Sequence, residues 1–236
     1  MIAALPYLYF ALSLFMIIVL YVGYKSIPVY SSSSSKASLR TTLYIGIGLL
    51  VWFAYLFVLS EFKVLADLSL PPRFPILVFL PMLLFIAVFV RKNKRAAWIQ
   101  DIPLGWLTYF QSFRILVEII LLYTFYKGLV PESATFEGLN FDILMGLSAP
   151  LVAYFLVPKT QQFKRLLLGW NISGIILIMA VATVIATSAY FPHLWGSTTS
   201  LVSQEFFELP YLLLAGFLAP LAIFIHVVSI MKLIQE

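Results

Sequence analysis

Two charged side chains, Arg114 and Glu118, lie within an apolar run that extends from about residue 104 to residue 126. A spacing of four residues places both on one face of a helix, and Gln111 lies about one turn earlier on that face. A lone charge near the middle of a bilayer costs about 2.5–3.5 kcal/mol on insertion scales. We therefore expect the two charges to pair and to face protein or water instead of lipid.

This pair has two interpretations. In the first, Arg114 binds a carboxylate or phosphate of a ligand, and Glu118 is its resting counter-ion or a proton site. Gln111, Arg114 and Glu118 are then the candidate ligand-binding residues. In the second, the two charges only neutralise each other and hold their helix within a bundle.

Asn171 and His226 form a second candidate polar pair. At about 1.5 Å per residue, Asn171 lies about 9 Å from the inner boundary and His226 about 22 Å from the outer boundary of a core about 30 Å thick. The two residues therefore share a level, and we expect them within one hydrogen bond or one bridging water of each other. The only other histidine is His193 and there is no cysteine, so we expect no metal site and no cofactor.

Prolines interrupt three of the apolar runs, at Pro81, Pro150 and Pro220. The last two lie in the repeated pattern Gly-x-x-Ala-Pro-Leu, which begins at Gly146 and at Gly216. A proline within a helix frees the carbonyl one turn earlier and kinks the helix axis. The kinks either open a cavity near the middle of the membrane or are the ordinary packing of membrane helices.

Signatures of several enzyme classes are missing. The sequence contains no Gly-x-Ser-x-Gly, no His-Glu-x-x-His and no phosphate-binding loop. A pair of intramembrane catalytic aspartates is excluded by placement, because we expect Asp67, Asp101 and Asp142 all to lie outside the deep parts of the spans. We expect no enzymatic activity.

The elements that position these residues follow from composition. Of the 236 residues, 62% are hydrophobic and 11% are charged, with a mean hydropathy of +1.01. Soluble domains carry about 25% charged residues, so the chain is an all-α integral membrane protein. Apolar runs of about the length needed to cross a bilayer predict a bundle of seven transmembrane helices in a single domain. The predicted spans are about 5–24, 41–60, 74–91, 104–127, 141–157, 165–188 and 211–233.

The net charge of +5 comes from short loops between these runs, and this placement indicates topology instead of nucleic-acid binding. Most of the lysines and arginines lie in the loops 25–40, 91–103 and 158–165. The opposite loops carry most of the acidic residues. The positive-inside rule therefore predicts an outer N-terminus and an inner C-terminus.

The segment Thr135-Phe-Glu-Gly-Leu-Asn-Phe-Asp-Ile-Leu-Met-Gly-Leu-Ser-Ala-Pro-Leu-Val-Ala-Tyr154 resembles a motif of uncharacterised bacterial seven-helix membrane proteins. Leu168-Gly-Trp170-Asn171, and Leu218-Ala-Pro220-Leu followed by His226, are similar to later blocks of that family. The resemblance covers roughly the C-terminal half. It implies seven helices and a bacterial inner-membrane location, and it implies no activity.

Two functional hypotheses remain. The leading one is a non-enzymatic membrane protein that binds or moves a small anionic or amphipathic molecule, because a charge pair lies beside kinked helices. The alternative is a structural or signalling component whose polar residues only assemble the bundle. The expected partners are the lipid bilayer and, under the leading hypothesis, a small-molecule ligand, without nucleic acid. The sequence leaves protein partners open. Aromatic residues at mid-span, such as Trp52, Tyr55 and Tyr109, either line a pocket for an apolar ligand or simply pack.

Overall fold

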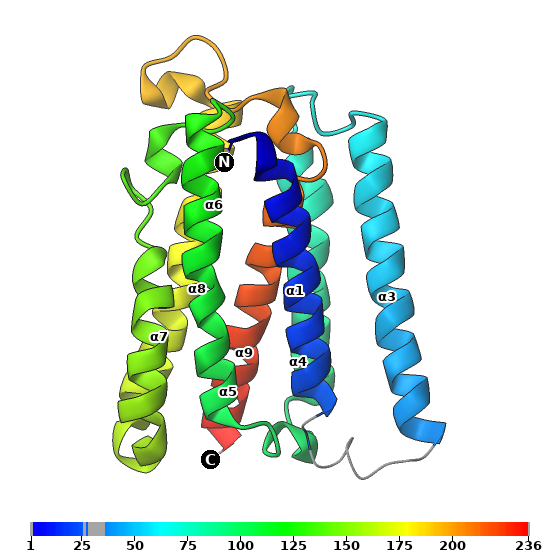
Figure 1. Cartoon of the computed structure of the whole chain (residues 1–236), viewed down its shortest axis with the longest axis vertical. Helices are drawn as coiled ribbons and strands as arrows, with labels where there is room; N and C mark the ends of the chain where they lie inside the picture. The colour runs from blue at the N-terminus through cyan, green and yellow to red at the C-terminus, as the bar shows by residue number, and fades with distance from the viewer. Residues whose placement is uncertain (1, 26, 28–35, 236) are drawn as a thin grey trace.

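The computed structural model describes residues 2–25, 27 and 36–235, and each regular element in these ranges is a helix (Figure 1). Six of the helices are long and apolar enough to cross a membrane. These six span Ile2–Lys25, Leu39–Glu61, Pro75–Asn93, Leu104–Tyr126, Val157–Tyr190 and Leu214–Gln235.

Several of the six consist of more than one helical segment. Their α-helical segments are α1 (Leu5–Lys25), α3 (Lys36–Glu61), α4 (Leu80–Asn93), α5 (Leu104–Phe110), α6 (Arg114–Tyr126), α8 (Thr160–Tyr190) and α9 (Ala219–Gln235). Two π-helical turns, η2 (Pro75–Phe79) and η9 (Leu214–Leu218), precede α4 and α9. The 3-10 turns are η1 (Ile2–Ala4), η3 (Ala97–Ile99), η4 (Gln111–Phe113), η5 (Glu132–Ala134), η6 (Val157–Lys159), η7 (Pro192–Trp195) and η8 (Gln204–Phe207).

Six of the seven predicted spans correspond to these helices, and the fifth differs. The fifth span was predicted at 141–157, and the structure has there α7 (Ile143–Phe155), an apolar helix of 13 residues. The segment 158–165, predicted as an inner loop, is mostly helical and belongs to η6 and the start of α8. Of the predicted inner loop 25–40, residues 26 and 28–35 lie outside the described residues.

The connection between α6 and α7 explains why α7 is short. After α6 the chain turns at Gly128, whose φ of +78° is one that glycine adopts readily. It then folds back through η5 and a hydrogen-bonded turn in which Asn140 N donates to Thr135 O at 3.1 Å. As a result α7 begins partway along the bundle, beside α6 (Figure 1). The connection, which contains only the short 3-10 turn η5, therefore lies at the depth where the sequence predicted the start of a full span.

The helix α9 lies at the centre of the bundle and α3 lies at its edge (Figure 1). In the most apolar stretch of the span that contains α9, 78% of the residues are buried within the protein. In the corresponding stretch of α3, only 11% are buried. The first helix begins at one end of the bundle, and α9 ends at the opposite end (Figure 1).

Two prolines determine how α3 attaches. In a regular helix, the carbonyl of Leu77 would accept a hydrogen bond from residue 81 and the carbonyl of Gly216 from residue 220, but both donors are prolines. Side chains of α3 donate instead. Tyr55 donates its hydroxyl to Leu77 O at 3.0 Å, and Trp52 donates its indole N–H to Gly216 O at 2.7 Å.

The third proline behaves differently. Pro81 and Pro220 each follow a π-helical turn, so the predicted distortions are present at these two positions. Pro150 lies inside α7, which continues through it. Close packing marks the same helix, because a Cβ on Gly146 would lie 2.9 Å from the backbone nitrogen of Ile115. Gly146 therefore lets α7 approach the start of α6.

Candidate functional site

The predicted charged residues lie at a break between α5 and α6. The single 3-10 turn of η4 separates the two helices, and Arg114 is the first residue of α6. Arg114, Glu118 and Gln111 are only 1%, 2% and 1% exposed, so all three face protein and not the outer surface. Burial within the protein keeps the charges of Arg114 and Glu118 away from lipid, where they would cost free energy.

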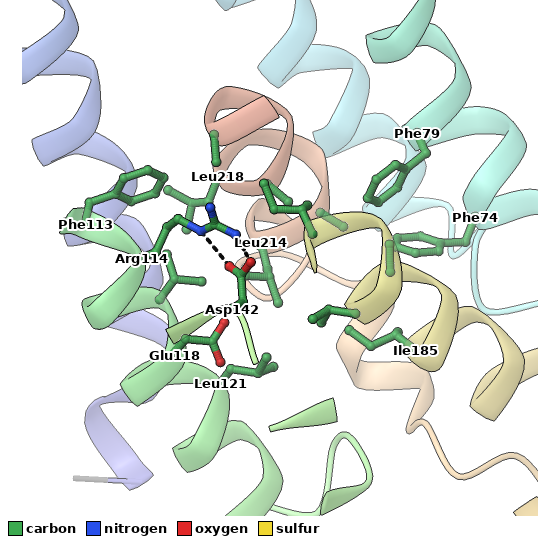
Figure 2. A pocket seen from close by; sticks show the side chains of 17 residues that line it. Phe74, Phe79, Phe113, Arg114, Glu118, Leu121, Asp142, Ile185, Leu214 and Leu218 are labelled. Carbon is green, nitrogen blue, oxygen red and sulfur yellow. Dashed lines mark hydrogen bonds and ion pairs between the residues drawn. The ribbon is translucent and has the colours of Figure 1, made fainter. Parts of the chain in front are cut away.

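Arg114 forms its ion pair with Asp142 instead of the predicted Glu118, whose charge interacts with Arg114 without forming an ion pair. The Arg114 Nε donates to Asp142 Oδ2 at 2.7 Å, and its second nitrogen NH2 pairs with Oδ1 (Figure 2). We expected Asp142 in an outer loop, outside the deep part of any span. It is buried because the segment before α7 folds back into the bundle, and it sits at the N-terminus of α7, where a carboxylate is favoured.

The remaining donors of Arg114 reach two further helices. Arg114 NH1 donates to His226 Nε2 on α9 at 2.9 Å, and NH2 donates to the carbonyl of Gly174 on α8 at 3.3 Å. Four of the five guanidinium N–H groups are thus directed at partners within the protein. Arg114 therefore joins α6, α7, α8 and α9.

The predicted contact between Asn171 and His226 is present. His226 Nδ1 lies 2.9 Å from Asn171 Oδ1, while Asn171 Nδ2 donates to Leu167 O at 2.8 Å. The two polar groups that the sequence suggested separately, one around Arg114 and one around His226, form a single network. Their connection was missed because depth along a helix does not specify which helices are neighbours.

Glu118 has a different partner. Its Oε2 accepts a hydrogen bond of 2.7 Å from Asn140 Nδ2. Asn140 also donates to Ala134 O at 3.0 Å and accepts from the backbone N–H of Asp142 at 2.8 Å. Asn140 therefore positions both carboxylates of the site. Sequence reasoning missed Asn140 and Asp142, although a polar pair directly before an apolar run was the available signal.

Gln111 lies apart from the two carboxylates. Its side-chain nitrogen donates to the carbonyl of Ala222 on α9 at 3.1 Å, and its Oε1 is buried without a hydrogen-bond partner. Gln111 does not line the cavity beside Arg114. Of the three predicted ligand-binding residues, the structure thus brings only Arg114 and Glu118 to one cavity.

The cavity has a volume of about 50 Å³, enough for a few water-sized groups. Arg114, Glu118 and Asp142 line one side of it, and Phe74 and Phe79 lie across from them (Figure 2). The other lining side chains are leucine, isoleucine, valine, alanine and phenylalanine. The cavity thus combines one charged wall with an otherwise apolar lining.

A larger apolar groove adjoins this cavity. It has a volume of about 280 Å³ and lies between η2 and α4 on one side and α8 on the other. Phe74, Phe79 and Ala182 line both the groove and the cavity. The groove also includes the exposed residues Leu80 and Thr183, so it reaches the apolar outer surface of the bundle.

No family model, curated protein or solved structure matches this chain. Within the described residues, no group of three or more histidine, aspartate or glutamate side chains is arranged to hold a metal ion. The chemistry of the site is therefore that of one arginine, two carboxylates and one histidine within an apolar bundle.

Proposed function

We propose that this protein binds an amphipathic small molecule, which enters the site sideways from the bilayer. One observation carries the proposal: an apolar groove open to the outer surface shares Phe74, Phe79 and Ala182 with a cavity that contains the buried charges. An apolar tail fits the groove, and a small polar group fits the cavity. Pockets of this kind, mainly apolar with a few convergent polar groups, are the usual sites for small ligands. The proposed role is non-enzymatic.

The anionic ligand of the first hypothesis is less well supported than the amphipathic one. An anion would have to displace Asp142 from Arg114, because Asp142 already takes two of the guanidinium nitrogens. The second candidate function is a structural or signalling role in which the network only assembles the bundle. The bonds of Arg114 to Asp142, His226 and Gly174 favour this alternative, because they use four of its five N–H groups.

The proposed topology has seven crossings, an outer N-terminus and an inner C-terminus, in a bacterial inner membrane. The count depends on α7, which with the folded-back segment before it would complete one crossing. The helices α1 and α9 begin and end at opposite ends of the bundle, as an odd number of crossings requires (Figure 1). Basic loops support the orientation, and the resemblance of residues 135–154 supports the bacterial location.

The experiment enlarges a side chain that lines both the groove and the cavity. Ala182→Phe places a large ring where the two spaces meet, whereas Ala180→Phe makes the same change at an exposed position of α8 outside both spaces. A photoactivatable dodecanol is added to purified protein in lipid nanodiscs, and the labelled peptides are identified by mass spectrometry. We expect wild type and Ala180→Phe to be labelled at groove residues such as Met179 and Leu83, and Ala182→Phe to lose this labelling. Equal labelling of these residues in all three proteins would favour the structural role.

A further inference from the structure

The charges that surround the cavity do not balance. Apart from tyrosines, the buried ionisable side chains in the described part of the chain are Arg114, Glu118, Asp142, His226 and Lys232. Lys232 lies elsewhere, with its Nζ donating to Gln100 O at 2.6 Å. Arg114 and Asp142 neutralise each other, which leaves Glu118 and His226 to be considered.

The histidine supplies no positive charge. A guanidinium can only donate, so His226 Nε2 must accept the hydrogen bond from Arg114 NH1. The proton of the ring is then on Nδ1, where it can be donated to Asn171 Oδ1. His226 is therefore the neutral tautomer.

Glu118 is thus the one acidic group of the network that forms no ion pair among the described residues. Arg114, one turn earlier on the same helix, interacts with it electrostatically, but the ion pair of Arg114 is with Asp142. The single hydrogen-bond donor to Glu118, Asn140, is neutral. The nearby Tyr9 from α1 is neutral as well, and its hydroxyl bonds to Thr124. A buried carboxylate in an apolar surrounding must either take up a proton or bind a cation.

We propose that the polar end of the bound molecule is a protonated amine held by Glu118, so that the ligand is a cationic amphiphile. This inference rests on the proposed function, because the amine must be carried by a chain that enters through the groove. A primary ammonium is small enough for a cavity of about 50 Å³ and donates three hydrogen bonds. Arg114 and Asp142 also line the cavity, but they form an ion pair with each other. The carboxylate left for the amine is that of Glu118, and the three charges together are negative, which disfavours an anion.

The test uses three probes with the same twelve-carbon chain: dodecylamine, dodecanol and dodecanoate. Binding of radiolabelled dodecylamine to the full chain in nonionic detergent is measured, with the other two probes as competitors. We expect dodecylamine to bind more tightly than dodecanol, and dodecanoate to compete least. Glu118→Gln should weaken dodecylamine binding about 10-fold to 100-fold, as expected for loss of a charge-assisted hydrogen bond, and should change dodecanol binding much less. Glu137→Gln, which changes an exposed glutamate at the end of the bundle, is the matched control.

A second measurement needs no substitution. Dicyclohexylcarbodiimide modifies protonated carboxyl groups in apolar surroundings, so Glu118 should react in the empty wild-type protein. Dodecylamine should protect Glu118 at concentrations at which dodecanol does not. Equal binding of amine and alcohol, or tightest binding of dodecanoate, would overturn the inference while the groove remains a binding site. If no probe binds and Ala182→Phe changes nothing, the proposed function itself fails.

Discussion

Arg114 on α6 and His226 on α9 are joined by a hydrogen bond of 2.9 Å in which a guanidinium nitrogen donates to Nε2. This bond fixes the tautomer of the imidazole and directs its remaining N–H toward Asn171 on α8. Since Arg114 also binds Asp142 at the start of α7, one side chain orders the polar interior of four helices. The stability of the bundle should therefore respond most strongly to changes around Arg114.

The first prediction identifies the partner of Arg114. Arg114→Gln and Asp142→Asn each leave a buried charge unpaired, and each should destabilise the protein by about 3–5 kcal/mol. The double variant removes both charges and should recover much of this loss. Glu118→Gln should cost less than about 1 kcal/mol, because the amide oxygen of glutamine can still accept the hydrogen bond from Asn140. The measurement is unfolding by sodium dodecyl sulfate in mixed micelles. Coupling of Arg114 to Glu118 instead of Asp142 in the double-variant cycles would contradict the observed pairing.

The second prediction concerns the close approach of α8 to His226. A Cβ on Gly174 would lie 2.2 Å from His226 Nε2, so Gly174→Ala must displace the ring and weaken its bond to Arg114. Overpacking of this kind costs about 1–3 kcal/mol. Gly169→Ala on the same helix is the control, since a Cβ there meets nothing within 4 Å. It should instead stabilise by about 0.5–1 kcal/mol, because alanine favours the helix. If both variants changed the stability in the same direction, the close contact between Gly174 and His226 would be contradicted.

The third prediction tests the attachment of α3. Tyr55→Phe removes the donor to Leu77 O and should cost about 0.5–1.5 kcal/mol. In a Pro81→Ala background the backbone N–H of residue 81 can bond to the same carbonyl, so Tyr55→Phe should cost less there. A double-mutant cycle measures this difference. Additive effects would mean that Tyr55 does not compensate for the proline.

The fourth prediction addresses the topology. The chain has no cysteine, so single cysteines report without background. Glu137→Cys, in the connection between α6 and α7, should react with an impermeant thiol reagent in intact cells. Gln161→Cys, near the start of α8, should react only after the membrane is opened. Both side chains are exposed, so access to the reagent depends on the side of the membrane. The opposite labelling pattern would reverse the orientation.

The apolar helices could be predicted from the sequence because each is a long continuous run that has to be about as long as a bilayer is thick. The prediction was incomplete between the spans 104–127 and 141–157, where the sequence indicated only an outer loop. Hydropathy does not distinguish an exposed loop from one that folds back inside the protein, where its polar groups find internal partners. The depth estimate for Asn171 and His226 succeeded because both lie in regular helices, where the rise per residue is constant.

Asp142 shows why the site was only partly predictable. The cost of a buried charge correctly predicted that Arg114 needs an acidic partner, and helix spacing suggested Glu118 as the nearest one in sequence. The partner comes instead from 28 residues away, because the folded-back segment brings Asp142 to the same level. A local pattern identifies which residues require partners, while the tertiary fold determines which partners they obtain.

The attachment of α3 has a consequence for which substitutions the chain tolerates. The acceptors for Trp52 and Tyr55 are carbonyls that lost their usual donors to prolines in two other helices. Replacing Pro81 or Pro220 would restore a regular bond within its own helix and at the same time give an aromatic side chain of α3 a competitor. A change that favours one helix would thus loosen another. During sequence divergence, we expect each proline and its aromatic partner to be lost or kept together.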